Sequence, residues 1–223
     1  MTAVSRLKGF FVPFDVKEFI WSYAACPNEP EKIDRLWRLA SPSVFWRESE
    51  IKSNKNGVVE TLDGFVIQSR YVGKGLAECE RLAVMAVTVG AGLPEEAQRL
   101  ISSGSLYDAT IADMLGSFAA EAAADSFCDY IKKTLSSKSL YTTLRFSPGY
   151  GDWSVAAQSD VMDYLEGCDG EIRLTDGGLL EPVKTITAAV GFSKKIQSED
   201  YPLGFCSGNK KCADCTTREC QKK

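Results

Sequence analysis

The feature that constrains the fold most is a helical repeat of apolar residues over positions 106–135. Its apolar side chains recur at the spacing of one helix face. The members of that face are Ile111, Leu115, Phe118, Ala122, Phe127, Ile131 and Leu135. The pattern predicts one helix of roughly 45 Å. Its middle, "AAEAAAD", carries small side chains, which either admit another backbone or a flat ligand or simply favour the helix.

Strand signals surround this helix. Residues 58–62 and 65–70 flank Asp63-Gly64, a two-residue turn that predicts a β-hairpin. Valine and alanine on both faces of residues 81–89 predict a strand that is covered on both sides. Residues 171–193 predict two short strands around a Gly-Gly pair and a proline.

Further helices are predicted over residues 94–103 and 154–167, and residues 10–50 carry short helical signals between prolines. Strands and helices do not alternate strictly, which favours an α+β domain with a mostly antiparallel sheet. The composition changes over the last twenty or so residues, so we expect a domain at 1–200 and a cysteine-rich tail at 201–223.

The composition excludes several kinds of function. The 223 residues contain no histidine, so this chain supplies no histidine base, metal ligand or lower ligand to cobalt. The net charge of −4 predicts no nucleic-acid partner. The first residues do not resemble a signal peptide, and the longest apolar run is too short for a bilayer. We therefore expect a cytoplasmic protein with no membrane association.

The segment "TTLRFSPGYGDW" at 142–153 joins a predicted strand, 141–146, to an abrupt turn. Arg145 offers a planar fork for a carboxylate, and Gly149 lets a backbone N–H approach a ligand. The ring of Tyr150 can lie against a base or a cation, and Pro148 fixes the loop. The alternative is an arginine paired with a nearby aspartate, followed by a Pro-Gly type II turn.

This segment resembles the Arg-x-x-x-Gly-Tyr motif of the reactivation domain of cobalamin-dependent methionine synthase, where that domain binds S-adenosylmethionine. The likeness continues in the same order along the chain. "LYDATIADMLGSFAAEAAADSFCDYI" resembles the family's long helix, and "IRLTDGGLLEPVKTITAAVG" resembles the segment after the motif. Upstream, "DGFVIQSRYVGKGLAECERLAVMAVTVG" resembles free-standing relatives. The resemblance covers about 60–200.

The resemblance implies a single C-shaped α+β domain with a twisted antiparallel sheet. It implies that Arg145 holds the carboxylate of S-adenosylmethionine, beside Pro148, Gly149 and Tyr150. Asp125 stands where the family's long helix offers a glutamate near the ligand. After the tyrosine the chain departs from the family pattern, with Gly151, Asp152 and Trp153 in place of proline and cysteine.

The chain has no room for the other modules of methionine synthase, and without histidine it lacks the corrinoid-binding motif. The resemblance therefore implies a free-standing subunit that acts on a cobalamin-carrying methyltransferase. The resemblance further implies that an electron from flavodoxin or another one-electron donor reduces Co(II) to Co(I), which takes the sulfonium methyl and leaves S-adenosylhomocysteine. The chain supplies no catalytic acid or base to this step.

Two alternatives stay open from sequence. The chain either activates a different corrinoid methyltransferase, with an Fe–S cluster in its tail, or is a non-catalytic module for S-adenosylmethionine binding or docking.

The tail sequence "CSGNKKCADCTTREC" spaces its four cysteines as C-x5-C-x2-C-x4-C. The set is Cys206, Cys212, Cys215 and Cys220. In a reducing compartment, four clustered thiols indicate a metal site before disulfides, so the tail is predicted to hold zinc or an Fe–S cluster. A thiol-rich or disulfide-linked tail without metal is the alternative.

Overall fold

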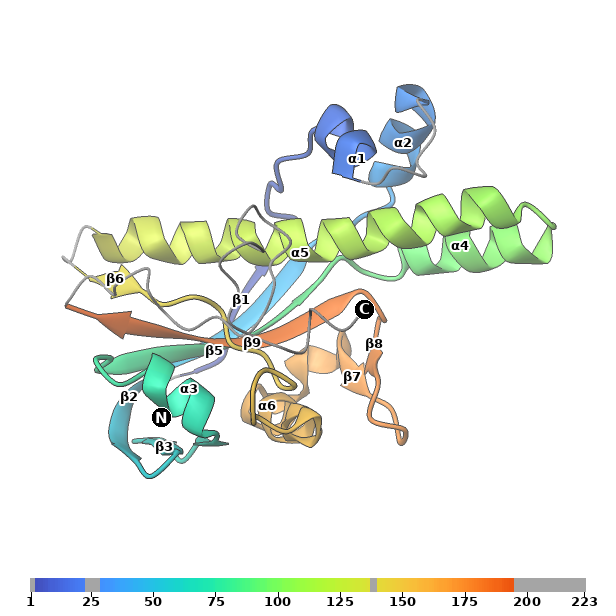
Figure 1. The fold of residues 1–223 in the computed structure, drawn as a ribbon. Coiled ribbons are helices and arrows are strands. Elements are labelled where there is room, and N and C mark those ends of the chain that lie inside the picture. Colours follow the sequence, from blue (N-terminus) through green and yellow to red (C-terminus); the bar gives the residue numbers. More distant parts are fainter. Residues whose placement is uncertain (1–2, 23–28, 137–139, 195–223) are drawn as a thin grey trace, which may run out of the picture.

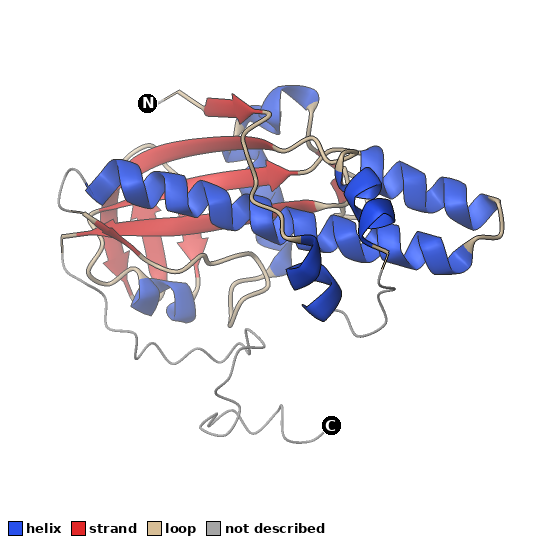
Figure 2. Ribbon diagram, turned by 90° about the horizontal axis from the view of Figure 1, so that it is seen from above, coloured by secondary structure: helices blue, strands red, loops and turns tan. Residues whose placement is uncertain are grey.

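The computed structural model describes residues 3–22, 29–136 and 140–194, and its centre is a curled antiparallel sheet (Figures 1 and 2). The sheet has the strand order β4-β3-β2-β5-β9-β6, with β1 paired to β2 outside that path. Its strands are β1 Ser5–Lys8, β2 Ser43–Lys55, β3 Val58–Thr61, β4 Val66–Gln68, β5 Arg81–Thr88, β6 Tyr141–Thr142 and β9 Thr185–Ser193. A separate hairpin pairs β7 Arg173–Leu174 with β8 Leu180–Glu181.

Helices lie on both faces of the sheet. The α-helices are α1 Val16–Ser22, α2 Pro30–Trp37, α3 Arg70–Gly75, α4 Gly92–Ser102, α5 Leu106–Ser136 and α6 Gln158–Tyr164. The short 3-10 helices η1 Val155–Ala157 and η2 Glu166–Gly170 flank α6. In Figure 1, α5 runs along one side of the sheet, whereas α3, α6 and the β7–β8 hairpin lie on the other side.

The central strand β5 contributes to two cores because successive side chains of a strand point to opposite faces. Ala83, Met85 and Val87 belong to the cluster beneath α5. Leu82 and Val84 belong to the cluster beneath α3 and α6. All five side chains are fully buried, and the prediction of a strand with cover on both sides is confirmed.

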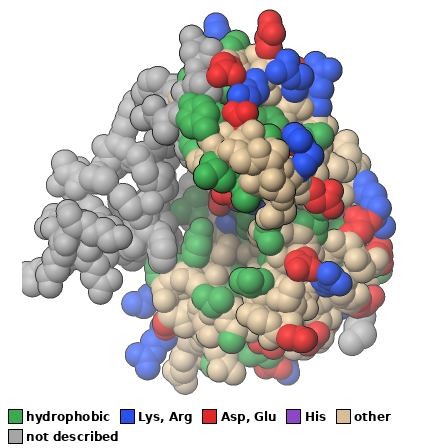
Figure 3. Space-filling model, turned by 90° about the vertical axis from the view of Figure 1, so that its right-hand side faces the viewer, with side chains coloured by type: hydrophobic (Ala, Val, Ile, Leu, Met, Phe, Trp, Pro, Cys, Tyr) green, Lys and Arg blue, Asp and Glu red, His purple; other side chains and the backbone are tan. Residues whose placement is uncertain are grey.

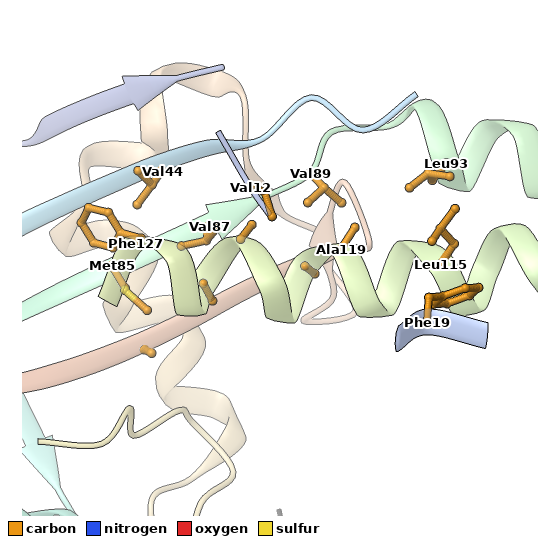
Figure 4. Close-up of a cluster of buried hydrophobic side chains, with 14 of the residues drawn as sticks. Val12, Phe19, Val44, Met85, Val87, Val89, Leu93, Leu115, Ala119 and Phe127 are labelled. Carbon is orange, nitrogen blue, oxygen red and sulfur yellow. The ribbon is translucent and has the colours of Figure 1, made fainter. Parts of the chain in front are cut away.

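The long helix is confirmed as α5, which spans 31 residues. Figure 4 shows Phe127 of this helix beside Val44 and Met85 of the sheet, whereas Leu115, nearer the start of the helix, lies between Leu93 and Phe19. The small residues in the middle of α5 are buried in the same cluster as the side chains of the sheet. They are Ala119, Ala120, Ala123 and Ala124.

The fold class predicted from sequence is confirmed as one α+β domain with a curled antiparallel sheet. Viewed from the right-hand side of Figure 1, the molecule is hollowed between an upper and a lower part, which gives it the expected C shape (Figure 3). The predicted boundary between residues 200 and 201 lies outside the described residues.

Several elements differ from the sequence prediction. The helical signals in residues 10–50 correspond to α1 and α2, but β1 and the 13-residue strand β2 were missed. The predicted strand at 141–146 is shortened to two residues plus a single bridge from Phe146 to Ala189. Its irregular path is set by two anchors, since the Thr143 N–H donates to Gly191 O and the Phe146 N–H to Ala189 O.

Candidate functional site

Arg145 lies between these two anchors and crosses from the sheet edge to α5. Its Nη2 donates to Glu121 Oε2 at 2.9 Å and to Asp125 Oδ1 at 2.8 Å. The two carboxylates are four residues apart, so one face of α5 presents both. The structure therefore brings Arg145 and Asp125 together and adds Glu121, which sequence reasoning missed. The four-residue spacing to Asp125 was the signal that could have found it.

The charges around Arg145 favour its cationic form. Burial lowers the pKa of Arg145, but the hydrogen bond that it donates to Glu121 and the charge of Asp125 more than offset this, and the net direction is upward. The pKa of Asp125 is raised, first by desolvation and then by the charge of Glu121, against the opposing effect of Arg145. Burial raises the pKa of the nearby Cys128 thiol to about 12, so this thiol is protonated at neutral pH.

The Pro148-Gly149 pair forms the tight turn that the sequence offered as one of two readings. The Tyr150 N–H donates to Ser147 O at 2.9 Å, and Gly149 has a φ of 99°. Positive φ at the third residue of a turn is the signature of type II. The Gly149 N–H donates to Trp153 O at 2.8 Å, so this donor is used within the loop.

Asp152 fastens this loop to the amino-terminal end of α3. Its carboxylate accepts hydrogen bonds from the Ser69 hydroxyl at 2.5 Å and from the N–H groups of Arg70 and Tyr71 at 3.0 Å each. These bonds lower the pKa of Asp152 to about 2. Gly151 approaches the ring of Tyr71 so closely that an added Cβ would lie 2.5 Å from it.

Tyr150 lies on the α3 side of the sheet. Burial raises the pKa of Tyr71, and the nearby Tyr150 phenol adds to this effect. Tyr71 also makes an edge contact with Phe146, with ring centroids 6.1 Å apart. Arg145 points to α5 and its neighbour Phe146 to the opposite core. The predicted site therefore wraps around the sheet edge, with the arginine on one face and the tyrosine turn on the other.

A hollow near the motif does not include Arg145. It has a volume of about 700 Å³ and lies between β4 and the η1–α6 segment. Trp153 and Ser154, which follow the predicted motif directly, are among its lining residues, but Arg145 and Tyr150 are not. The motif and this hollow are therefore neighbours and not one site.

The predicted metal ligands Cys206, Cys212, Cys215 and Cys220 lie outside the described residues. Within the described ranges, no group of three or more histidine, cysteine or acidic residues could hold a metal ion. Cys79 and Cys168 are buried, and neither forms a disulfide with another described residue. None of the helices over 3–22, 29–136 and 140–194 is long and apolar enough to cross a membrane.

Comparisons with known proteins find a similar fold but no similar sequence. The crystal structure of the MetH reactivation domain bound to AdoHcy superposes with a TM-score of 0.60 at 12% sequence identity. The match covers 88% of this chain and 80% of that one. No protein-family model matches the sequence, and no curated protein matches it significantly. The likeness shows a shared fold.

Proposed function

We propose that this chain binds S-adenosylmethionine through the cluster of Arg145, Glu121 and Asp125. The observation that carries the proposal is a partly buried arginine bonded to two exposed carboxylates at a sheet edge. An amino-acid zwitterion offers the complementary charges. Its carboxylate pairs with the guanidinium, and its ammonium pairs with Glu121 or Asp125. The fold shared with a domain solved with AdoHcy supports this ligand class.

The arginine keeps donors for such a ligand. Both of its bonds to described residues come from one nitrogen, Nη2. The planar fork carries further N–H groups that suit a bidentate carboxylate. The two carboxylates hold the fork in place before the ligand arrives, which lowers the entropic cost of binding. Tyr150 and the turn at Pro148-Gly149 provide a wall for the ligand on the other side of the sheet edge from Arg145.

The wider role we propose is that of a stand-alone reactivation subunit for a cobalamin-carrying methyltransferase, as in a split methionine synthase. The S–CH₃ bond of the ligand breaks as the methyl passes to the partner's reduced cobalt, and S-adenosylhomocysteine remains. A one-electron donor such as flavodoxin supplies the electron for the cobalt. This chain binds and orients the methyl donor and shields it from water, and none of its residues transfers a proton.

Calorimetry with two ligands tests the binding site. S-adenosylmethionine carries the amino-acid group, whereas 5′-methylthioadenosine lacks it. Arg145→Ala removes a charge-assisted contact of roughly 1.5–3 kcal/mol, which weakens S-adenosylmethionine binding by about tenfold or more. It leaves the affinity for methylthioadenosine unchanged. Arg173→Ala, which removes an exposed arginine paired with Glu181, is the matched control.

Two results would overturn the assignment. One is unchanged S-adenosylmethionine affinity in Arg145→Ala. The other is an equal loss for both ligands, which would indicate a general structural defect. The role as a reactivation subunit is tested separately. A corrinoid methyltransferase trapped as Co(II) should regain its methyl from S-adenosylmethionine and a reductant only when this protein is present.

A further inference from the structure

The hollow beside β4 is acidic. It is about 700 Å³ in volume, and three aspartates, Asp63, Asp160 and Asp163, are among its lining residues. No lysine or arginine is among the described residues that line it. Asp160 and Asp163 are exposed on α6, and neither forms an ion pair with another described residue. An occupant with positive charge therefore fits this hollow.

Asp63 contributes charge as well as shape. Its carboxylate accepts hydrogen bonds from the Tyr164 hydroxyl and the Thr61 hydroxyl, each at 2.7 Å. Desolvation opposes ionisation of Asp63, but hydrogen bonds from Ser49, Tyr164 and Thr61 outweigh it, and the pKa is lowered. Asp63 is therefore an anion at neutral pH, held in place between the β3–β4 hairpin and α6.

One wall of the hollow is the free edge of the sheet. The order of strands ends at β4, whose only partner in the described sheet is β3. The Thr61 N–H donates to Phe65 O and the Ser69 N–H to Gly57 O. In an antiparallel pair the hydrogen-bonded positions alternate, so the backbone groups of Val66 and Gln68 point away from β3. Both residues line the hollow.

The other wall contains a buried donor that lacks an acceptor. Trp153 lines the hollow and is 2% exposed. Its indole Nε1–H has no hydrogen-bond partner among the described residues. A buried donor without an acceptor is costly and uncommon in native proteins. Because this nitrogen has almost no exposed surface, the ring must move slightly toward the hollow before the backbone carbonyl of a bound segment can accept its hydrogen bond.

We propose that this hollow is a docking groove for an extended, basic segment of a partner protein. The segment adds as a strand beside β4 through the outward backbone groups of Val66 and Gln68. Its lysine or arginine side chains meet Asp63, Asp160 and Asp163. The three aspartates favour a basic peptide because their charges are complementary to lysine and arginine. The open edge of β4 favours a peptide in an extended conformation. This goes beyond S-adenosylmethionine binding and does not depend on it.

The test uses the full chain and a synthetic probe, an acetylated six-residue peptide of alternating lysine and valine. We expect the amide signals of Val66 and Gln68 to shift on titration followed by NMR. Asp160→Asn combined with Asp163→Asn should lower the affinity for the peptide by about tenfold and make that affinity less dependent on salt. Asp176→Asn combined with Glu95→Gln, which changes net charge equally at exposed positions elsewhere, is the matched control.

A modified peptide and a further protein variant test strand pairing and the indole donor separately. A peptide that is N-methylated at alternate residues keeps its charge but loses strand pairing, and it should not bind. Trp153→Phe removes the indole donor and should lower the affinity for the peptide. It also leaves a small space where the larger ring was. S-adenosylmethionine affinity should be unchanged in Asp160→Asn combined with Asp163→Asn, so the two proposals fail independently.

Several outcomes would overturn the proposal of a docking groove. These are no binding, equal binding of a glutamate–valine peptide, or binding without shifts at Val66 and Gln68. If the peptide binds only after Lys210→Gln and Lys211→Gln are introduced, the basic segment belongs to this chain and the partner-protein proposal is wrong. If the edge is protected simply by being short, the peptide fails to bind and the groove is only a surface depression.

Discussion

The two faces of the sheet are covered in different ways. On one face, the single helix α5 provides much of the apolar cover, with α1, α2 and α4 beside it. On the other face, α3, η1, α6, η2 and the β7–β8 hairpin share the cover, and each of them is short. Polar bonds between segments far apart in sequence occur on both faces, such as Arg145 to Glu121 on the α5 face. On the opposite face they join short elements that no long helix spans.

The polar bonds on the face covered by α3 and α6 connect specific loops and helices. Asp152 joins the motif loop to α3, and Tyr164 joins α6 to Asp63 in the β3–β4 turn. Arg47 of β2 is buried, pairs with Glu166, and has its guanidinium 4.9 Å from the ring centre of Tyr164. Glu166, Cys168 and Asp169 all have positive φ, a conformation that costs about 1–2 kcal/mol per residue. This face therefore carries local strain that its long-range contacts offset.

The largest effect should come from truncating the α5 face. Leu115→Ala removes a fully buried side chain of the α5 cluster, and we expect a loss of about 2–5 kcal/mol in the free energy of unfolding. Leu106→Ala, in the same helix but 63% exposed, should change it by less than about 0.5 kcal/mol. Urea denaturation measures both. Similar losses at the two positions would show that burial beneath α5 does not set the stability of this face.

The next largest effect should come from a substitution on the opposite face, where the motif loop closely approaches α3. Gly151→Ala combines a φ of 57° with a Cβ only 2.5 Å from the Tyr71 ring. Gly178→Ala is the control, because its φ is 76° but no atom lies within 4 Å of the added Cβ. Thermal unfolding should show Gly151→Ala to be less stable than Gly178→Ala by about 1–3 kcal/mol. Equal stabilities would mean that the loop moves away from α3 at little cost.

The third effect appears only on acidification. The pKa of Asp152 is lowered from its ordinary value near 3.8 to about 2 in the folded protein. A lowered pKa gives stability that is present above about pH 4 and is lost as the pH falls towards 2. Asp152→Asn should therefore be less stable than the wild type at pH 7 but converge with it near pH 2. An unchanged difference between the two proteins across this range would contradict the assigned role of Asp152.

The smallest effect concerns an exposed ion pair on the α5 side. Arg38 donates to Asp34 at 2.8 Å across four residues, and its side chain is 77% exposed. Such pairs contribute roughly 0.3–0.5 kcal/mol, so Arg38→Ala should lower the midpoint of urea denaturation only slightly. The effect should shrink further in high salt. A loss above about 1 kcal/mol would place part of the stability of this face in surface charge.

The sequence alone determined the elements whose signal is local. The apolar repeat of α5, the Asp63-Gly64 turn and the two-sided burial of β5 each follow from neighbouring residues along the chain. The Pro-Gly turn and the arginine–aspartate pair were among the readings that the motif allowed. The strand β2 was missed because its second half, "ESEIKSNK", is polar and alternates poorly, so it is specified by pairing with β5 and β3.

Tertiary structure decided how the motif is divided. A strand reverses its side chains at every residue, and the sheet edge separates Arg145 from Phe146 and Tyr150, so residues adjacent in sequence meet α5 and α3 on opposite faces. Glu121 joins Arg145 only because α5 lies along that face. The acidic groove likewise brings Asp63 beside Asp160 and Asp163, which lie about a hundred residues away in sequence. Such distant pairings depend on the register of the whole sheet, which no local pattern encodes.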